Sequence, residues 1–388
     1  MKEKSVLLDA LFQKQAGKLH SKQLIASIQS GDASFKWVGT YGNAADQTSV
    51  HEQTPFFIAS IDKLITATLI LQLAEEGSLS LDNPAAEYLP DDLIMGLHVF
   101  KGKDYSSIIT LRHLLTHTSG LADWYEDFPH QGENLVESIL INGDRDLPLA
   151  EMMEYVRTRL TPNFAPQNIE AFLKSTNKNS GSKPLKIKTR YTDTGFMLLM
   201  AILSEVTGKP LEQLHQEKIY TPLGMSHTWL IGRTTPNNPT YSPLQLHARE
   251  QSVSIPKILR SVWGVYSTCD DMVLFLKALF QGKLFSNPET LTLMMDGFHK
   301  FGFPTDKASI RLPGWPIAYS HGCMHFKLPR LFNSFKAMPE LIGHTGSTGC
   351  WLFYAPELDL YLTGATDDLT AGALPFKFVP NLLRILKE

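Results

Sequence analysis

The stretch FFIASIDKLITATLILQLAEEG, residues 56 to 77, places one serine and one lysine three residues apart at the start of an otherwise apolar run. Residues at i and i+3 of a helix lie on the same face, so Ser60 and Lys63 can touch if the helix begins near the serine. The run is apolar on almost every side, which predicts a buried helix that ends near Gly77. A lysine in such surroundings loses hydration, and this favours the neutral amine that can accept a proton.

The three-residue spacing of Ser60 and Lys63 suits a serine that is activated by a neighbouring base. A serine hydroxyl is a poor nucleophile at neutral pH unless an adjacent base takes its proton, and a partly desolvated amine is one such base. The helix N-terminus adds N–H donors that can stabilise an oxyanion formed at Ser60. The alternative is structural, with Ser60 capping the helix and Lys63 reaching water from the first turn. The tetrapeptide alone leaves both interpretations open.

The composition bounds the class of protein. The chain has 388 residues, enough for two domains or one large one, and is 43% hydrophobic and 19% charged, as is ordinary for a soluble globular protein. A net charge of -3 provides no overall positive field, so we expect no nucleic-acid partner. The three cysteines lack the spacing of a metal site or a disulfide framework, which favours a reducing compartment.

The N-terminal residues 1–15 indicate an amphipathic helix, because two acidic residues interrupt them and their apolar piece is too short for a signal peptide. The longest apolar run, residues 64–74, is shorter than the roughly 20 residues of a membrane span. We therefore expect a cytoplasmic protein without a membrane span.

Strand patterns gather at the two ends of the chain. Residues 35–42 and 55–58 indicate strands, residues 350–367 indicate two strands around a turn, and residues 376–388 a closing helix. The middle is mostly helical segments broken by loops, including the polar stretch 174–190. We expect a single composite catalytic unit. Its sheet region is formed by residues 1–80 and 332–388, and its helical region by residues 81–331.

Further motifs follow Ser-x-x-Lys along the chain: ITLRHLLTHTSGL (109–121), Tyr191-Thr192-Asp193, TPLGM (221–225), WGVYSTCDDMVLFLKAL (263–279) and His344-Thr345-Gly346. Together they resemble the class C β-lactamase, D,D-peptidase and esterase branch of the serine β-lactamase-related and penicillin-binding protein family. The resemblance spans roughly residues 54–365 and keeps the family's order. It implies an α+β fold of the serine β-lactamase/D,D-peptidase type, an antiparallel sheet flanked by helices with a largely α-helical region.

The resemblance also implies roles for single residues. Ser60 would be the nucleophile, Lys63 its proton partner and Tyr191 the general base or acid. The backbone N–H groups of Ser60 and Ser347 would form the oxyanion hole. Which of Lys63 and Tyr191 is the resting base stays open, and their titrations are coupled. The motif positions assigned to substrate binding are Asp193, His344, Thr345 and Gly346.

Two of these positions depart from the family pattern. Asp193 stands where the family usually has asparagine, so an ionised side chain there can accept hydrogen bonds but not donate them. His344 stands where many β-lactamases have lysine, so positive charge near the substrate would depend on pH around about 6.5. This favours esters or amides that lack a compulsory carboxylate.

Metal and cofactor sites are not expected. His113 and His117 are four residues apart, a spacing that can bind zinc, but no glutamate follows His113 and the segment resembles a structural loop of the family. Gly343, Gly346 and Gly349 lack the Gly-Lys-Ser/Thr of a phosphate loop, and close approach of the backbone to a substrate explains them better.

The predicted function is a serine hydrolase that acts through a covalent acyl-enzyme on small esters or short amides. The alternatives within the family are a D,D-peptidase or D-aminopeptidase and a β-lactamase. An alternative of another class is a non-catalytic penicillin-binding sensor or a scaffold. The sequence leaves the acyl group, the leaving group and the oligomeric state open.

Overall fold

The structure is a computed structural model that describes residues 2–127, 146–167, 187–236, 241–248, 250–254, 257, 264–303, 312–333 and 337–387. The chain divides into two compact units. The first comprises Met1–Ile65, Glu212–Leu284 and His325–Glu388, and the second comprises Thr66–Leu211 and Phe285–Met324. The boundary at Ile65 falls within helix α2 (Asp62–Glu75).

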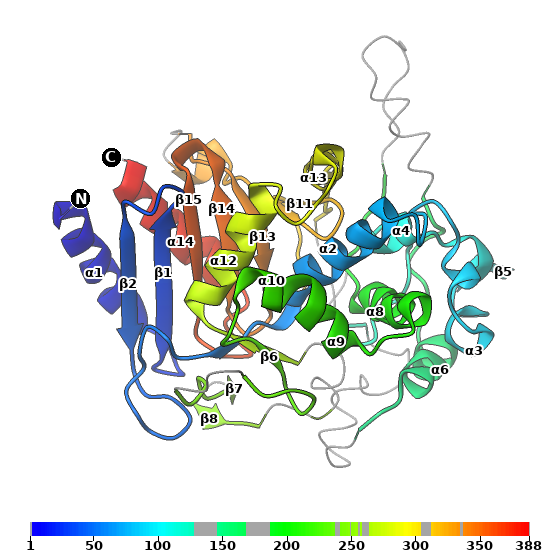
Figure 1. Cartoon of the computed structure of the whole chain (residues 1–388), viewed down its shortest axis with the longest axis horizontal. Coiled ribbons are helices and arrows are strands. Elements are labelled where there is room, and N and C mark those ends of the chain that lie inside the picture. The colour runs from blue at the N-terminus through cyan, green and yellow to red at the C-terminus, as the bar shows by residue number, and fades with distance from the viewer. Residues whose placement is uncertain are drawn as a thin grey trace, which may run out of the picture. The chain divides into compact units, whose positions relative to one another are not determined.

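The first unit contains six neighbouring strands of an eight-stranded sheet, in the order β12-β13-β14-β15-β1-β2. The strands are β1 (Leu24–Ser30), β2 (Lys36–Tyr41), β12 (Met324–Phe326), β13 (Leu341–Thr345), β14 (Trp351–Ala355) and β15 (Leu360–Ala365). Strand β15 pairs with β1 in a register that sets Ile25 opposite Ala365 and Ser30 opposite Leu360. The two ends of the chain therefore meet in one sheet (Figure 1).

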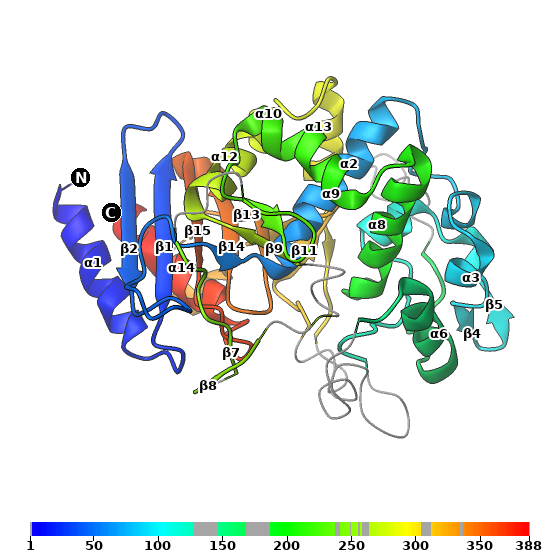
Figure 2. The same cartoon turned by 60° about the horizontal axis from the view of Figure 1, so that its bottom comes forward.

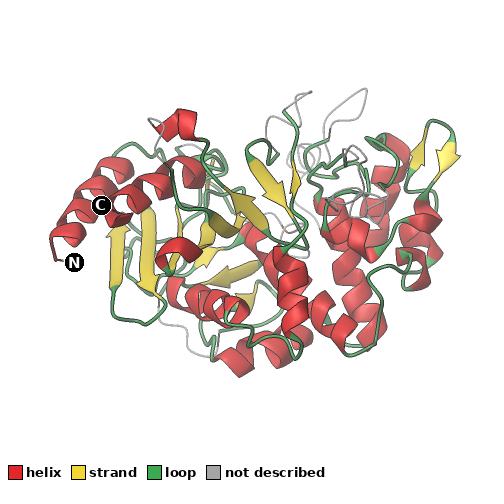
Figure 3. Cartoon of the chain, turned by 90° about the horizontal axis from the view of Figure 1, so that it is seen from above, coloured by secondary structure: helices red, strands yellow, loops and turns green. Residues whose placement is uncertain are grey.

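Helices cover this sheet on both faces (Figure 3). Helices α1 (Lys2–Ala16) and α14 (Leu374–Lys387) contact each other, and Phe378 of α14 meets Trp351 of β14 at a ring-centroid distance of 5.9 Å. Helix α12 (Cys269–Phe280) packs on the opposite face, where Phe280 stacks on Tyr354 at 5.0 Å. Residues 351 and 354 of one strand point to opposite faces, so these contacts place the helices on the two sides of the sheet.

Smaller elements complete the first unit. A three-stranded sheet runs in the order β3-β9-β6, and β7 pairs with β8. The bounds are β3 (Phe56–Phe57), β6 (Trp229–Leu230), β7 (His247–Ala248), β8 (Gln251–Ser252), β9 (Val265–Ser267), α9 (Leu211–His215), a π-helical turn (Gln216–Tyr220) and α10 (Thr221–Leu223). Strand β3 leads into the turn that carries Ser60, so this small sheet sets where that turn begins.

The second unit is mostly helical, as Figure 2 shows for α3, α6 and α8. Its elements are the continuation of α2, α3 (Asp91–Ile94), β4 (Val99–Phe100), β5 (Lys103–Asp104), α4 (Leu111–Leu115), α6 (Leu149–Arg159), α8 (Asp193–Thr207), α13 (Pro288–Met295), β10 (His299–Lys300) and β11 (Ile317–Tyr319). Helix α8 is apolar on most of its surface, packs against α4, and ends at Gly208 with φ +64°. A left-handed glycine is the common end of a helix.

Most predicted elements of the first unit are confirmed: the opening helix, the strand in residues 35–42, the two strands in 350–367 and the closing helix. Strand β1 was not predicted, and the middle of the chain also carries short strands. His344 lies near the end of β13. Residues 174–186 of the predicted surface loop, and Trp263, lie outside the described residues. Within the described part of the chain, no helix has the length and hydropathy required to span a membrane.

Candidate active site

Ser60 lies in a single 3-10 turn, Ala59–Ile61, which runs directly into α2. Lys63, one helical turn further on, donates from Nζ to Ser60 Oγ at 3.1 Å. Lys63 is fully buried, whereas Ser60 is partly exposed. The predicted contact between these two side chains is therefore present, and it joins a buried lysine to a partly exposed serine.

The backbone before Ser60 is in an unfavourable conformation. Ala59 has φ +46°, in the left-handed region that side chains other than glycine rarely adopt. Such a residue persists only when its surroundings hold it there, and such positions cluster at functional sites. The turn that presents Ser60 is therefore maintained by packing rather than by local preference.

Buried side chains also surround Asp62, the first residue of helix α2. Asp62 is buried, and its Oδ1 lies 3.4 Å from Nε2 of the buried His215. The ring of Tyr220 lies 5.5 Å from the ring of His215, and burial, followed by the charge of Asp62, raises the pKa of its phenol. Sequence reasoning did not identify His215 or Tyr220, because neither belongs to a motif.

Strand β13 brings the third motif to the same unit. His344 is fully buried, and its Nδ1–H donates to the carbonyl oxygen of Thr345 at 2.7 Å. Burial, followed by the charge of Lys63, lowers the pKa of His344 to about 3. The imidazole is therefore neutral near neutral pH, and the expected change of charge around pH 6.5 does not occur.

A tight turn follows the motif and leads into β14. Gly349 donates its N–H to the carbonyl of Gly346 at 3.1 Å, and Gly346 donates to the carbonyl of Cys350 at 2.9 Å. Within this turn Ser347 is exposed, while its neighbours Gly346 and Thr348 are buried. The turn therefore leaves Ser347 at the surface.

Gly346 packs directly against the turn that carries Ser60. A Cβ atom added at Gly346 would lie 2.8 Å from Ala59 Cβ and 2.3 Å from Cys350 Sγ. Real Cβ atoms do not approach other atoms so closely, so glycine is required for the two turns to touch. The first unit thus brings together Ser60, Lys63 and the residues of the third motif.

Tyr191 and Asp193 belong to the second unit. Tyr191 is 5% exposed and lies in an aromatic cluster, with its ring 4.4 Å from His117 and 6.0 Å from Tyr319. His117 also accepts the N–H of Thr192 at Nδ1, at 3.3 Å. This histidine, which the sequence raised only as a possible metal ligand, therefore fixes the segment that carries Tyr191.

A buried carboxylate supports the start of α8. Asp123 is fully buried, accepts the N–H of Asp193 at Oδ2, and accepts the N–H of Glu126 at Oδ1 at 2.7 Å. Burial, followed by the charges of Asp193 and Asp127, raises the pKa of Asp123. Arg190 forms an ion pair with Asp127 and supplies positive charge to this group. No sequence motif indicated Asp123.

The described residues contain no group of three or more His, Cys, Asp or Glu side chains that could hold a metal ion. His113 has other partners: Nδ1 accepts the N–H of Thr110 at 3.0 Å, and Nε2–H donates to the carbonyl of Gln167 at 2.6 Å. These bonds cap helix α4 and anchor a neighbouring segment. The four-residue spacing of His113 and His117 therefore serves structure.

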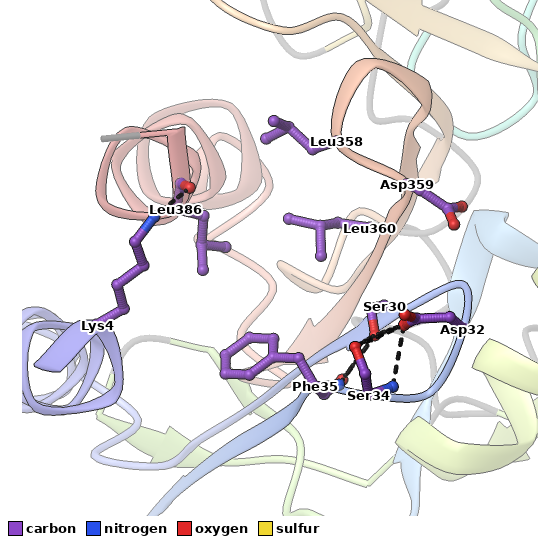
Figure 4. A pocket seen from close by; sticks show the side chains of 9 residues that line it. All are labelled: Lys4, Ser30, Asp32, Ser34, Phe35, Leu358, Asp359, Leu360 and Leu386. Atoms are coloured by element: carbon purple, nitrogen blue, oxygen red, sulfur yellow. Dashed lines mark hydrogen bonds between the residues drawn. The ribbon is translucent and has the colours of Figure 1, made fainter. Parts of the chain in front are cut away.

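A cavity of about 290 Å³ lies in the first unit (Figure 4). It is lined by Lys4, Ser30, Asp32, Ser34, Phe35, Leu358, Asp359, Leu360 and Leu386. None of these is a predicted site residue. The cavity lies between the chain's end helices and the β1–β2 and β14–β15 turns, and the hydroxyls of Ser30 and Ser34 in its lining both donate to Asp32 Oδ1.

Comparisons with known proteins agree with the motifs. PbpX of Bacillus subtilis, named as a penicillin-binding protein, is 29% identical over 238 residues, 60% of this chain and 48% of that protein. Teichoic acid D-alanine hydrolase of Staphylococcus aureus is 26% identical over 253 residues, 64% of this chain and 51% of that protein. The chain spans about half the length of the curated relatives it matches.

The fold is shared with solved structures. D-amino acid amidase from Ochrobactrum anthropi SV3, in its complex with D-phenylalanine, superposes with a TM-score of 0.69 at 19% identity, covering 99% of each chain. This likeness confirms the predicted fold. The model of the family described as Beta-lactamase matches residues 23–373, which is most of the chain. The chain therefore belongs to the beta-lactamase family.

Proposed function

We propose that this chain is a serine hydrolase that forms a covalent acyl-enzyme at Ser60 and acts on small esters or short amides. The observation that carries the proposal is the 3.1 Å contact between Lys63 Nζ and Ser60 Oγ, with Lys63 fully buried and Ser60 partly exposed. A buried amine beside a reachable hydroxyl is the arrangement that activates a serine.

The steps follow from the contact of Lys63 with Ser60 and from the family resemblance. Ser60 Oγ attacks the carbonyl carbon of the substrate, and its proton passes to Lys63 or, by the resemblance, to Tyr191. The tetrahedral oxyanion accepts hydrogen bonds from the backbone N–H groups of Ser60 and Ser347. Protonation of the leaving alcohol or amine breaks its bond to the carbonyl carbon. Water then attacks the acyl-enzyme and releases the acid and Ser60. The role of Tyr191 rests on its motif ahead of α8.

The state of His344 supports substrates without a compulsory carboxylate. Its pKa of about 3 leaves it neutral at the pH values where most hydrolases work, and its Nδ1–H is engaged by Thr345. A lysine at this position would hold an anionic group by charge, whereas a neutral imidazole does not. Lactams, whose recognition in the family uses such an anionic group, therefore rank below neutral esters and amides.

Derivatives of D-amino acids are the second candidate substrates. Two of the matched proteins are named as a teichoic acid D-alanine hydrolase and a D-amino acid amidase. Asp193 adds a carboxylate where the family usually has a neutral amide, and a carboxylate suits the free ammonium group of an amino acid ester or amide. Asp193 would then favour a cationic acyl group.

The test is active-site labelling followed by turnover. The wild-type chain, Ser60→Ala and Ser107→Ala are incubated with a fluorophosphonate, and intact mass is followed. Ser107 is an exposed serine of the second unit and serves as the matched control. We expect one adduct on the wild type and on Ser107→Ala, and none on Ser60→Ala. Equal labelling of all three proteins would contradict the proposal.

Substrate class is then read from steady-state rates with p-nitrophenyl acetate, D-alanine p-nitroanilide, D-alanyl-D-alanine and benzylpenicillin. Turnover of the acetate ester above the others supports the first candidate, and turnover of the D-alanine derivatives supports the second. A burst of acylation without further turnover would indicate the penicillin-binding sensor instead. An absence of both labelling and turnover would indicate a scaffold.

A further inference from the structure

Two backbone groups just before Ser60 are bonded to side chains from the far end of the chain. The N–H of Phe57 donates to Asp367 Oδ2 at 3.1 Å. The thiol of Cys350 donates to the carbonyl of Ile58 at 3.1 Å. Both bonds lie within the first unit and join residues about three hundred positions apart in the sequence.

Thr348 connects these two side chains. Its hydroxyl acts on the carboxyl group of Asp367, lowering the pKa of that group, and its Oγ1 donates to Cys350 Sγ at 3.7 Å. Asp367, Thr348 and Cys350 are all fully buried. We call these three residues the clamp, because they hold the N–H of one residue and the carbonyl of the next.

We propose that the clamp is a positioning device for the acylation reaction, fixing the backbone of Phe57 and Ile58 and, through the strained Ala59, the place of Ser60. The proposal rests on the proposed role of Ser60. Ala59 has φ +46°, so the chain on its N-terminal side must be held for the turn to persist. Thr348 also follows Ser347 directly, so the clamp fixes both predicted oxyanion donors.

The clamp contains the carboxyl group of Asp367, whose charge affects how well the oxyanion is stabilised. Oδ1 of Asp367 has no hydrogen-bond partner among the described residues. Burial raises the pKa of Asp367 to about 8, although the N–H of Phe57 and the hydroxyl of Thr348 act in the opposite direction. At neutral pH the clamp therefore holds a neutral carboxylic acid. Above pH 8 the carboxyl group of Asp367 becomes negatively charged. This charge repels the negative charge that develops on the oxyanion.

Few other titratable groups lie around Asp367 in the described structure. The thiol of Cys350 has its pKa raised by burial and then by the charge of Asp367, so it stays protonated as a donor. His247 on β7 donates its backbone N–H to the carbonyl of Asp367 at 2.8 Å. Asp368 is the next residue, and its carboxylate accepts from Thr370 at 2.7 Å and 2.8 Å. Titration of the clamp is therefore assigned to Asp367.

The first arm of the test is the rate of fluorophosphonate labelling at Ser60 between pH 6.5 and pH 9, in the wild type, Asp367→Asn and Asp367→Ala. Asparagine keeps an acceptor for Phe57 and stays neutral. The ratio of the wild-type rate to the Asp367→Asn rate should fall about fivefold between pH 8 and pH 9 as Asp367 ionises. Asp367→Ala should label about tenfold more slowly at every pH, because the N–H of Phe57 loses its acceptor.

Thr363→Val is the matched control for these variants. Thr363 is a buried residue of β15 whose hydroxyl donates to the carbonyl of Trp351 at 3.0 Å, and its hydroxyl bond goes to neither Phe57 nor Ile58. The Thr363→Val variant loses one buried hydrogen bond in the same sheet but keeps all three residues of the clamp. Its labelling rate should follow the wild type across the pH range. Equal slowing in Thr363→Val and Asp367→Ala would show a general structural effect and overturn the proposal.

The second arm does not depend on reactivity. Hydrogen exchange is followed by mass spectrometry in a peptide covering residues 56–63. Exchange should be faster by about tenfold in Asp367→Ala than in the wild type or Thr363→Val, and close to wild type in Asp367→Asn. Likewise Cys350→Ala should speed this exchange, and Cys350→Ser, which keeps a donor for Ile58, should restore it.

The two arms separate the two proposals. A wild-type chain that is never labelled at Ser60 refutes the proposed function, while the exchange data still decide whether the clamp holds the turn. Labelling with a pH-independent ratio and unchanged exchange refutes the clamp and leaves the serine hydrolase standing. If Asp367→Ala does not fold, the labelling rates of Asp367→Asn and the hydrogen exchange of Cys350→Ala and Cys350→Ser test the clamp in its place.

Discussion

Replacement of Asp367 by asparagine should change how the stability of the protein depends on pH. Asp367 is fully buried, and its pKa is raised from 3.8 to about 8, with burial as the main cause. Below about pH 4 the carboxyl is protonated in both the folded and the unfolded chain. Between the two pKa values the unfolded carboxyl loses its proton while the folded one keeps it, so the free energy of unfolding falls as pH rises.

The size of the effect follows from linkage. Each pH unit in this window removes about 1.4 kcal/mol from the free energy of unfolding, and the loss levels off above about pH 8. Asparagine does not titrate, so Asp367→Asn escapes this loss. Its stability relative to the wild type should therefore increase by roughly 3 to 4 kcal/mol between pH 5 and pH 8.

The assay is urea unfolding at a series of pH values, with the free energy of unfolding taken from the midpoint and slope of each curve. The control is Asp32→Asn, an exposed aspartate of the same unit whose pKa is lowered to about 2, chiefly by the hydroxyl of Ser30. That group is ionised in both states above pH 5, so its substitution should give a constant difference. A constant difference for Asp367→Asn as well would refute the raised pKa and the neutral clamp.

Three further outcomes follow from the site. Gly346→Ala should slow fluorophosphonate labelling at Ser60 by at least about tenfold, since the new Cβ would meet Cys350 Sγ at 2.3 Å; wild-type labelling would contradict the packing. His344→Gln should leave the shape of the pH–rate profile between pH 5 and pH 8 unchanged, because the pKa of His344 is about 3; loss of an inflection near pH 6.5 would show otherwise. Asp193→Asn should alter the ratio of D-alanine p-nitroanilide to acetate ester turnover without abolishing labelling, and complete loss of labelling would count against a role limited to substrate choice.

The sequence was most informative where the decisive contacts are local. Ser60 and Lys63 are one helical turn apart, so their spacing alone predicts the contact that is observed at 3.1 Å. The strands in residues 350–367 and the closing helix carry strong apolar patterns and were predicted with their turn. Strand β1 was missed because its short run LIASIQS gains its stability from pairing with β15 and β2, which lie on either side of it in the sheet.

Contacts between distant segments account for the rest. The bonds from Phe57 to Asp367 and from Cys350 to Ile58 cross about three hundred residues, so no local pattern indicates them. The charge of His344 was misjudged for a related reason. Its residue type predicts a pKa near 6.5, but complete burial on β13 brings it to about 3, and burial is a property of the folded sheet.

The pairing of the chain ends gives the nucleophilic turn its support. Strand β15 is held between β14 and β1, and Asp367 follows β15 by two residues, so the register of this pairing sets where the carboxyl of Asp367 lies. Cys350 immediately precedes β14 and is set by the same register. A strained Ala59 requires support that its own sequence does not provide, and a central strand pair is among the last parts of a sheet to open. The geometry of Ser60 is therefore tied to the central strands of the sheet as well as to the turn in which it lies.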